Sequence, residues 1–259
     1  MTGFRALLCL LIAAGAAHRS HAGDFPVSEV VEKAMQSPYR IEEDFERDKT
    51  RHPGEVLTFV GIEPGMTVLD LFSGGGYYTT LISGIVGDDG AVTAHNNAAY
   101  LPYAGEELEK RKARGTPANV QSLIAEANDL ELPESHYDAV MAVLTWHDFY
   151  YVDPENGWPA IDAEGMVRKL CRTLKPGGVL GVVDHAAESG ADVRETAQNL
   201  HRIDPARVRS DLQGDCFEYT GEIGILANPR DDHSLPMFDE GIRGQTDRFV
   251  YRFRKISQN

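Results

Sequence analysis

Four short clusters of histidine and carboxylate side chains are the part of this sequence that could do acid–base chemistry. Each combines at least one histidine with an acidic residue close by: Trp146-His147-Asp148, Asp184-His185, His201-Arg202-Ile203-Asp204 and Asp231-Asp232-His233. An imidazole beside a carboxylate is a usual arrangement for a general base that works near neutral pH. We predict His147 as the first candidate for such a base and His185 as the second. Asp148 or Asp184 would orient the imidazole.

The same side chains leave other interpretations open. A histidine–aspartate pair often forms only a local hydrogen bond or caps a loop. Two histidines and an acid from neighbouring strand ends could also hold zinc, iron or copper. Because the chain has no HxxxH or HxH spacing, we predict no metal ligands. A third possibility is a protein that binds a small ligand without catalysis.

A glycine-rich turn is the second feature with chemical potential. In VLDLFSGGGYYTTLIS, residues 68–83, an apolar run ends at Asp70, the turn Ser73-Gly74-Gly75-Gly76 follows, and a helical pattern begins at Tyr77. Glycine permits positive φ and lets a ligand approach the backbone closely. In an open parallel sheet, ligands collect at the carboxyl ends of strands. The turn lacks the lysine of a phosphate loop and the spacing of the dinucleotide fingerprint, so a ligand-free strand–helix turn stays an alternative.

Strands that alternate with helices must position these residues. Apolar runs predict strands at 67–72, 91–96, 120–125, 137–144 and 179–184, the last after a KPGG turn, and helical spacing predicts helices at 77–85, 104–113, 161–174, 194–201 and 205–212. Residues 27–59 are also helical in pattern, with one short helix beginning near Pro53. This alternation is typical of βαβ units, an α/β sheet with helices on both faces. FEYTGEIGIL and RFVYRFRK predict an antiparallel pair that closes the sheet edge.

The first 22 residues have the pattern of a cleavable export signal. Arg5 precedes an apolar run over residues 6–17, and Ser20-His21-Ala22 is a suitable cleavage site. An uncleaved anchor is the alternative, although the run is shorter than the ~20 residues that span a bilayer. We therefore predict an exported, periplasmic protein with no stable membrane insertion after cleavage. Residues 23–259 would form one domain, with 23–60 as an N-terminal helical cap.

The net charge indicates which class of partner the protein binds, and the cysteines indicate whether it could form a disulfide. The net charge of the chain is −15, and loss of Arg5 and Arg19 with the leader would make it more negative. A negative field repels phosphate backbones, so we expect a small-molecule substrate and no nucleic acid. Cys171 and Cys216 could form a disulfide in an oxidising compartment. However, Cys171 falls on the apolar stripe of a predicted helix, which favours a buried thiol.

Three segments of the chain resemble class I S-adenosylmethionine-dependent methyltransferases. VLDLFSGGGYYTTLIS resembles the first motif of that family, YDAVMAV its fourth strand, and VRKLCRTLKPGGVLGVVD (167–184) its helix and turn before strand five. The order of elements from about residue 55 to 185 also follows the family. This resemblance implies a Rossmann-like fold with a mostly parallel seven-stranded sheet and an antiparallel last strand. It also implies S-adenosylmethionine as cofactor and methyl transfer as the reaction.

Nearly the whole chain after the leader is also similar to a branch of exported bacterial proteins called predicted methyltransferases. The similarity lies in RDKTRHPGEVLTF, GGGYYT, WHDFY, DHAAESG, LHRID and IRGQTDRFVYRF. Because the label of that branch is itself an inference from fold, it says little about the acceptor. The sequence therefore leaves the acceptor as an unidentified small molecule.

The resemblance implies a role for each residue that matches a family motif. The methionine part of the cofactor would lie against Asp70, Ser73, Gly74, Gly75, Gly76 and Tyr77, the adenine against Glu126 and Ala127, and the pocket floor would be Thr145 and Trp146. The family usually ends its second strand with Asp or Glu, which accepts from both ribose hydroxyls. This chain has Asn96 there, whose amide accepts only through its oxygen. The resemblance therefore implies weaker ribose binding than in the family.

Overall fold

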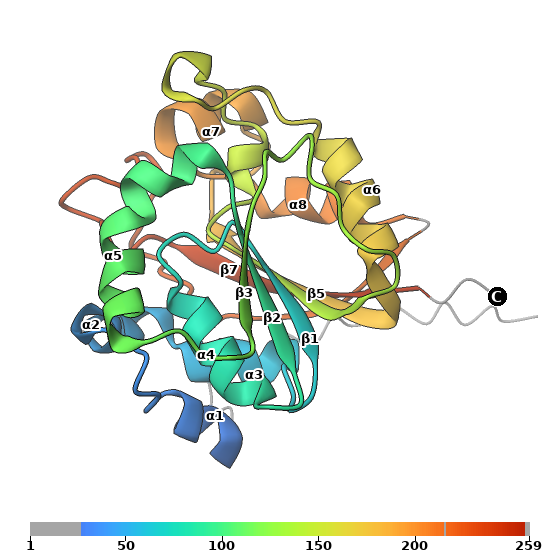
Figure 1. Cartoon of the computed structure of the whole chain (residues 1–259). Helices are drawn as coiled ribbons and strands as arrows, with labels where there is room; N and C mark the ends of the chain where they lie inside the picture. The colour runs from blue at the N-terminus through green and yellow to red at the C-terminus, as the bar shows by residue number, and fades with distance from the viewer. Residues whose placement is uncertain (1–26, 215, 257–259) are drawn as a thin grey trace, which may run out of the picture.

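The computed structural model describes residues 27–214 and 216–256 (Figure 1). The predicted export signal lies outside these described residues. Within the described ranges, no helix has both the length and the hydropathy that a membrane span requires.

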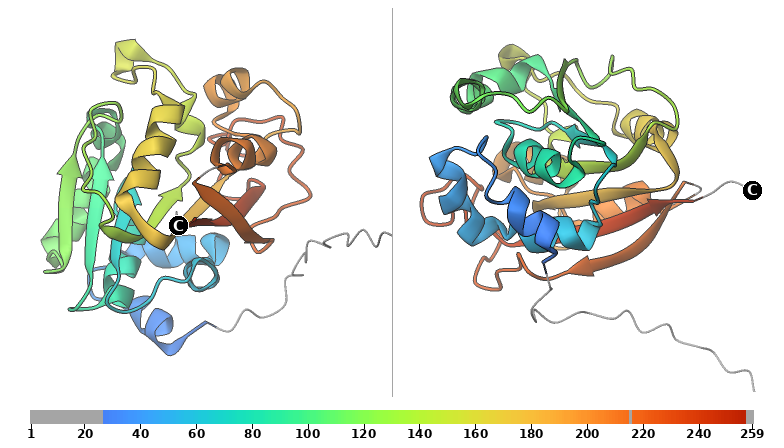
Figure 2. Two further views of the ribbon diagram at one scale, coloured as in Figure 1. Left: turned by 90° about the vertical axis from the view of Figure 1, so that its right-hand side faces the viewer. Right: turned by 60° about the horizontal axis from the view of Figure 1, so that its bottom comes forward.

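One seven-stranded sheet forms the centre of the fold, in the order β3-β2-β1-β4-β5-β7-β6. The strands are β1 Thr67–Leu71, β2 Ala91–Asn96, β3 Val120–Ile124, β4 Tyr137–Val143, β5 Leu174–His185, β6 Phe217–Ile223 and β7 Arg248–Lys255. β1 to β5 pair in parallel, whereas β7 runs antiparallel to both β5 and β6. Figure 2 shows the twist of the sheet from β3 at one edge to β6 and β7 at the other. The predicted α/β class and the antiparallel closing strand are both confirmed.

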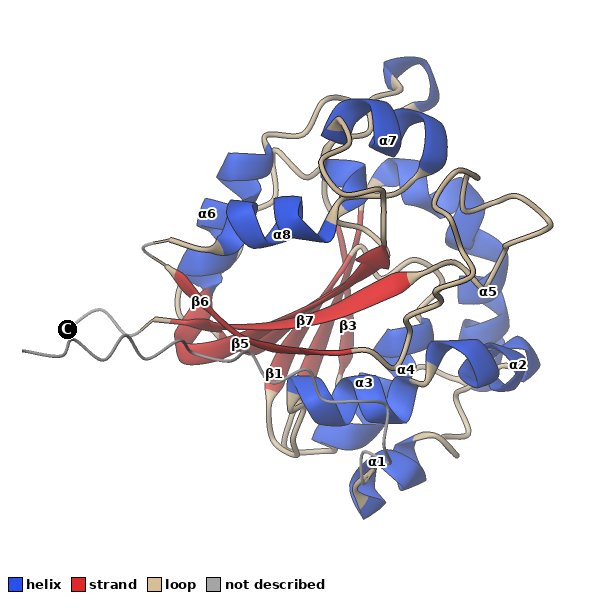
Figure 3. Cartoon of the chain, turned by 180° about the vertical axis from the view of Figure 1, so that it is seen from behind, coloured by secondary structure: helices blue, strands red, loops and turns tan. Residues whose placement is uncertain are grey.

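Helices cover both faces of this sheet. They are α1 Glu29–Ala34, α2 Glu42–Arg51, α3 Pro53–Val60, α4 Tyr77–Val86, α5 Leu101–Arg114, α6 Ala163–Thr173, α7 Val193–Leu200 and α8 Pro205–Leu212, with short 3₁₀ turns η1 Ala98–Tyr100, η2 His147–Phe149 and η3 Pro154–Asn156. Apolar residues of α1, α3 and α4 bury one face, and those of α6 and α8 bury the other (Figures 1 and 3). The predicted N-terminal helical cap is therefore part of one of the two layers.

The β5 strand begins earlier than the sequence predicts. We expected a KPGG turn followed by a strand at 179–184, but β5 starts at Leu174. Tyr137 pairs with Leu174 while Ala139 pairs with Val179, so the register shifts across the glycines. Gly177 has a φ of +78°, which a residue with a Cβ rarely adopts. Residues 175–178 therefore face the single Asp138 of β4, and the two glycines lie in an irregularity inside the strand rather than in a turn before it.

A disulfide joins Cys171 of α6 to Cys216, immediately before β6. The two Cα atoms lie 6.1 Å apart, within the usual range for a bridge. Our prediction of a buried free thiol was wrong, because Cys171 is only partly buried and faces the segment that leads into β6. The bridge ties a face-covering helix to the edge strand of the sheet.

The carboxyl ends of β1, β4 and β5 lie side by side, and the backbone there has an unusual conformation. β1 pairs with β4, and β4 with β5. Phe72 follows β1 with a φ of +51°, and Leu144 follows β4 with a φ of +59°. Positive φ in a large apolar residue costs about 1–3 kcal/mol, and such strain clusters at functional sites. This edge is therefore where a site should be sought.

Candidate active site

The glycine loop between β1 and α4 is braced from the end of β2. The Oδ1 of Asn96 accepts from the Gly74 amide at 2.9 Å. The Nδ2 of Asn96 donates to the Gly74 carbonyl at 3.0 Å and to Ser73 Oγ at 3.2 Å. Both amide hydrogens and one acceptor position of Asn96 are thus used to shape the loop. Asn96 acts as a structural brace in this conformation, which leaves it little capacity to bind a ribose.

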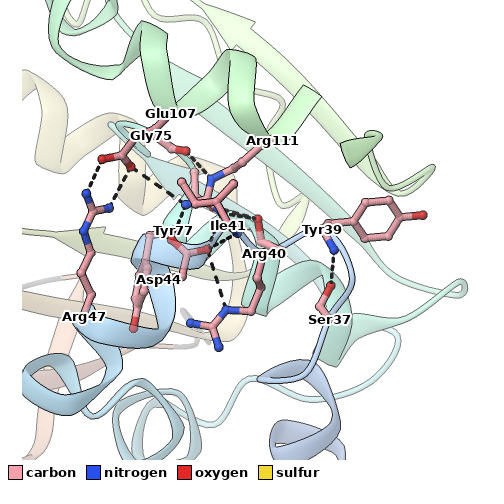
Figure 4. A network of polar contacts seen from close by, with 12 residues as sticks. Ser37, Tyr39, Arg40, Ile41, Asp44, Arg47, Gly75, Tyr77, Glu107 and Arg111 are labelled. Carbon is pink, nitrogen blue, oxygen red and sulfur yellow. Dashed lines mark hydrogen bonds and ion pairs between the residues drawn. The ribbon is translucent and has the colours of Figure 1, made fainter. Parts of the chain in front are cut away.

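A network from α2 and α5 clamps the outer side of the loop (Figure 4). The Arg111 Nε donates to the Gly75 carbonyl at 2.6 Å, and its two Nη atoms donate to the carboxylate of Asp44, each at 2.6 Å. Glu107 forms an ion pair with Arg47 of α2. A Cβ added at Gly75 would lie 2.8 Å from the Cβ of Glu107. Gly75 is therefore required for the close packing of α5.

Gly74 has the opposite environment. Its φ is +56°, and a Cβ added there would meet no atom within 4 Å. Gly74 lines a cavity of about 480 Å³, which we call the glycine-loop cavity. A volume of this size is typical of small-molecule sites. The bare backbone at this position therefore faces open space that a ligand could fill.

The glycine-loop cavity gathers six of the predicted site residues. They are Ser73, Gly74, Gly75, Tyr77, Thr145 and His185. The hydroxyl of Thr145 is buried and has no hydrogen-bond partner in the described part of the chain. Since a buried polar group without a partner is costly, this hydroxyl marks a place where a polar ligand atom would be stabilised.

Four arginines line the cavity, Arg47, Arg51, Arg243 and Arg248, and they give it a positive wall. Arg248, at the start of β7, is 7% exposed and donates to the Thr50 carbonyl at 2.7 Å and, more weakly, to the Thr246 carbonyl. Arg51 lies over the ring of Tyr77 at 4.8 Å. Within residues 27–214 and 216–256, no carboxylate forms an ion pair with the guanidinium of Arg51 or Arg248. Burial and the neighbouring charge of Arg51 lower the pKa of Arg248. An anionic ligand group would relieve this uncompensated charge.

Asp70 lies beneath the loop and does not line the glycine-loop cavity. It is 2% exposed, and its Oδ2 accepts from the Thr79 hydroxyl at 2.6 Å. Burial raises the pKa of Asp70 to about 7, against the opposing effect of the hydrogen bonds from Thr79. In this structure Asp70 joins β1 to α4 through Thr79, which differs from the direct cofactor contact that the resemblance implies.

His147, Asp148, Asp184 and His185 converge as the sequence predicts. The ring Nδ1 of His147 lies 2.8 Å from Asp184 Oδ1, and the backbone amides of His147 and His185 donate to the same carboxylate at 2.9 and 2.7 Å. The His147 Nε2 lies 3.3 Å from Asp148 Oδ1. The hydroxyl of Tyr100 donates to the other oxygen of Asp148. These contacts form one buried polar chain across the ends of β4 and β5.

The two predicted base candidates differ in their protonation. Burial opposes charge on His147, but the carboxylates of Asp184 and Asp148 outweigh it and raise the pKa of His147 to about 9. Burial, followed by the charge of His147, lowers the pKa of His185 well below its ordinary value. At neutral pH, His147 is therefore cationic and His185 neutral. Only a neutral imidazole can accept a proton.

His185 also has the better position for contact with a ligand in the glycine-loop cavity. Its Nδ1 lies 2.6 Å from Thr246 Oγ1, which fixes the ring. Its Nε2 has no hydrogen-bond partner among the described residues, and the side chain lines the glycine-loop cavity. The ring thus presents a free acceptor atom near the loop.

A second cavity of about 290 Å³ adjoins the first, and we call it the aromatic cavity. Its lining is mostly aromatic: Tyr100, Tyr103, Tyr151, Trp158, His201 and Phe238, with Leu144, Met237, His147 and Asp148. It shares five lining residues with the glycine-loop cavity, including Tyr100 and Leu144. The Tyr100 ring stacks on Phe72, with centroids 5.2 Å apart. The two cavities therefore have a common wall.

Five predicted cofactor residues lie outside the glycine-loop cavity in addition to Asp70. Glu126 accepts from the Ala98 amide at 3.1 Å, and Ala127 is buried in the core. Trp146 is fully buried and donates to Asp211 at 3.2 Å. Gly76 and Asn96 line a third, smaller cavity of about 250 Å³ that shares only Ser73 with the first. The structure does not bring these residues together with Gly74 and His185 in one cavity.

The remaining polar clusters of the sequence hold the C-terminal segment in place. Arg202 is fully buried and forms a bidentate pair with Asp231, at 2.8 and 3.1 Å. His233 Nε2 lies 3.0 Å from Asp247 Oδ2. Asp247 also accepts from the Asn228 amide at 2.7 Å. These contacts anchor the chain between β6 and β7.

Several residues that shape the site were not predicted from the sequence. Arg51, Arg248 and Tyr100 come from α2, β7 and the turn after β2, and none belongs to a recognised motif. The one signal was that Arg51 and Arg248 lie in the segments RDKTRHPGEVLTF and IRGQTDRFVYRF, whose function the motifs left unexplained. No comparable signal in the sequence pointed to Tyr100, because its stacking on Phe72 and its hydrogen bond to Asp148 arise only in the folded chain.

Comparison with known proteins gives a consistent family. A methyltransferase domain family matches residues 62–239. The chain is 28% identical to a ubiquinone/menaquinone biosynthesis C-methyltransferase of Shewanella halifaxensis, over 70% of this chain and 67% of that enzyme. It is 34% identical to the same-named enzyme of Shewanella woodyi, over 48% of this chain but only 44% of that enzyme. A crystal structure of a SAM-dependent methyltransferase from Aquifex aeolicus shares the fold, with a TM-score of 0.55 and 22% identity over 85% of this chain and 99% of that one.

Proposed function

The chain belongs to the methyltransferase-domain family and is an S-adenosylmethionine-dependent methyltransferase, and we propose that it methylates a small, planar acceptor outside the cytoplasmic membrane. One observation carries the proposal for the reaction. The unobstructed backbone of Gly74 and the unpaired Nε2 of His185 line the same cavity of about 480 Å³. A backbone surface for the cofactor and an atom that can accept a proton from the methyl acceptor thus lie in the same cavity.

The residues of the glycine-loop cavity fit the cofactor. Open space at Gly74 admits the methionine part against the backbone. The uncompensated guanidinium of Arg51 or Arg248 suits its carboxylate, and the unpartnered Thr145 hydroxyl suits a polar atom. When bound, the cofactor supplies a methyl group on a sulfonium, which is already a good leaving group. The task of the chain is to align the acceptor and to take its proton.

His185 is the residue best placed to take that proton. It is neutral because burial lowers its pKa, its Nδ1 is fixed by Thr246, and its Nε2 is free. The charged His147 supports the same site as a fixed cation between Asp184 and Asp148. Removal of the acceptor proton as the methyl group arrives keeps the acceptor from accumulating positive charge.

The aromatic cavity supports a planar acceptor. Its lining of tyrosine, tryptophan and phenylalanine rings favours stacking with another ring. It shares a wall with the glycine-loop cavity, so an acceptor whose ring lies in the aromatic cavity would direct its reacting atom past that wall, toward the cofactor and His185. The names of the Shewanella relatives describe C-methyltransferases of quinone biosynthesis, which is compatible with a ring as acceptor.

Two measurements test this function. We expect S-adenosylmethionine and S-adenosylhomocysteine to bind with one site in calorimetry and to raise the melting temperature. Tritiated S-adenosylmethionine with a panel of phenols and hydroxynaphthalenes should then yield a labelled product. The His185→Gln variant should bind S-adenosylhomocysteine normally but lose about 10²–10⁴-fold in turnover, as expected for a general base. His136→Gln, at an exposed position, is the control. Absence of binding by both nucleosides would refute the proposal.

The disulfide supports the proposed location. Disulfides form and persist in oxidising compartments such as the periplasm, and the Cys171–Cys216 bridge closes a loop with a sequence separation of 45. A loop of this length contributes about 2–4 kcal/mol to stability. Fractionation of bacteria that express the full chain should place the oxidised protein in the periplasm, with a mass that lacks residues 1–22. Recovery from the cytoplasm, with both thiols open to alkylation and the leader intact, would contradict export.

A further inference from the structure

We propose that His147, Asp148 and His201 form a binding site for one divalent transition-metal ion in the wall of the aromatic cavity. The three side chains come from η2 and from the end of α7. Each offers one ligand atom, and all three atoms lie within 4.8 Å of one another. The site does not depend on methyl transfer, because its evidence lies outside the glycine-loop cavity.

The geometry already approaches that of a bound ion. Metal bonds of about 2.0–2.1 Å to nitrogen and oxygen, at tetrahedral angles, place ligand atoms about 3.4 Å apart. The His147 Nε2 and Asp148 Oδ1 are 3.3 Å apart. His201 completes the set with a ring nitrogen within 4.8 Å of the other two ligand atoms, and its ring nitrogens have no hydrogen-bond partner in the described residues. Its ring packs edge-to-face against His147, with centroids 5.6 Å apart.

The charge of the cluster calls for a cation. Asp148 and Asp184 are 6% and 0% exposed, and both face the same imidazole. No lysine or arginine of the described chain forms an ion pair with either carboxylate. An imidazolium at His147 balances only one of these two buried carboxylates, so the cluster keeps one negative charge without a counter-ion. A divalent metal ion that replaces the Nε2 proton of His147 would supply the missing charge and would bond directly to Asp148.

A supporting shell holds the ligands in place. Asp184 accepts from the Nδ1 side of His147 at 2.8 Å, which directs Nε2 toward the cavity. Tyr100 donates to the second oxygen of Asp148, which leaves Oδ1 for the ion. A carboxylate behind a ligating histidine and a hydrogen bond behind a ligating carboxylate are the usual supports of metal sites. This arrangement separates the cluster from a chance group of polar residues.

The donor set indicates the class of metal. Two imidazole nitrogens and one carboxylate oxygen suit zinc, iron or cobalt, whereas magnesium and calcium prefer oxygen ligands alone. Three protein ligands leave at least one position of the ion open. That position would face the aromatic cavity of about 290 Å³, where an oxygen atom of a bound molecule could occupy it.

Metal titration of the untagged protein, after dialysis against a chelator, tests the site. We expect one Zn²⁺ per chain in calorimetry, little response to Mg²⁺, and visible d–d absorption on addition of Co²⁺. His201→Gln and Asp148→Asn should each weaken Zn²⁺ binding at least 100-fold and abolish the Co²⁺ absorption. Asp184→Asn, which alters the contact to the His147 ring and an acceptor of the His147 and His185 amides but no ligand atom, should weaken binding about 10–100-fold.

Control variants separate this site from adventitious binding and from loss of the fold. His136→Gln and His233→Gln replace histidines outside the cluster and should bind Zn²⁺ and Co²⁺ like the unmodified protein. S-adenosylhomocysteine binding by each ligand variant reports whether the fold is intact. Tight 1:1 binding that survives in both His201→Gln and Asp148→Asn, or no Co²⁺ absorption in the unmodified protein, would overturn the proposal. Either outcome would leave the methyl-transfer proposal standing.

Discussion

Two buried aspartates mark two regions of the site that are built differently. Asp70 is the penultimate residue of β1 and accepts a hydrogen bond from the hydroxyl of Thr79 in α4. Asp184 near the end of β5 accepts two backbone amides and contacts the imidazole of His147. The first carboxylate is therefore poorly stabilised as an anion, whereas the second is surrounded by donors. Their strands are separated only by β4.

The surroundings of each aspartate extend this contrast. Around the glycine loop, most polar groups satisfy one another: Asn96 braces Gly74, and Arg111 joins Gly75 to Asp44. Around Asp184, polar atoms remain available to a ligand, as the free Nε2 of His185 shows. The loop region is thus a scaffold that fixes a backbone shape. The histidine region holds the groups that can react or coordinate.

The largest effect should come from breaking the scaffold. Arg111→Met removes both hydrogen bonds to the fully buried Asp44 and leaves that carboxylate without its bidentate partner. Loss of one member of a buried pair costs about 3–5 kcal/mol, and Asp44 would keep only the longer contact with Arg40 Nε at 3.8 Å. Urea denaturation measures this loss. Lys110→Met on the same helix breaks only solvent-exposed pairs with Glu43 and Glu106, so it should be far milder. Equal effects would mean that α5 does not clamp the loop through Asp44.

Asp70→Asn should reveal the weak stabilisation of the Asp70 anion. Because the folded-state pKa is raised from 3.8 to about 7, the stability that protonation confers is full below pH 3.8 and is lost as the pH rises through 7. The shift corresponds to at most about 4 kcal/mol. Asparagine does not ionise, so the variant does not lose this stability as the pH rises. The free energy of unfolding of the variant minus that of the unmodified protein should therefore be a few kcal/mol larger at pH 8 than at pH 4. Guanidinium denaturation at both pH values gives the comparison. A pH-independent difference would mean that Asp70 is ionised without penalty.

Gly74→Ala should have a smaller effect, mainly on ligand binding. The added methyl group would enter the open space at the loop, so we expect S-adenosylhomocysteine affinity to fall about tenfold, or about 1.4 kcal/mol. Gly177→Ala is a matched control, with a φ of +78° and no neighbour within 4 Å, but it lies at the other end of β5. Both variants incur a similar cost for positive φ. Only Gly74→Ala should weaken binding in calorimetry, and the same loss in both would exclude a ligand at Gly74.

The fold was largely predictable because the apolar runs and helical spacings are regular. The strand at 91–96 matches β2 residue for residue, and the helix at 205–212 matches α8. The start of β5 was not predictable, since KPGG has the composition of a turn and only pairing with Tyr137 keeps it in the sheet. The disulfide was missed because an apolar stripe does not reveal what faces each of its positions.

The site was predictable only where its residues follow strands directly. His147, Asp148, Asp184 and His185 converge because β4 and β5 are neighbours, which the order of elements implies. The positive wall depends on contacts between distant segments, such as the hydrogen bond from Arg248 to Thr50, 198 positions apart. Asn96 occupies the expected strand end, but its side chain turns to the loop because three partners are available there. The local sequence pattern does not show which partners a side chain contacts in the folded protein.

Tyr100 lines both the glycine-loop cavity and the aromatic cavity, and its ring stacks on Phe72 while its hydroxyl donates to Asp148. A ligand in either cavity that shifts this side chain changes the free energy with which a second ligand binds in the other cavity. By thermodynamic linkage this effect is reciprocal, and each ligand changes the affinity of the other by the same factor. Affinities measured with one compound alone would then differ from those that operate during turnover, and a ternary titration would recover the cooperativity that separate titrations miss.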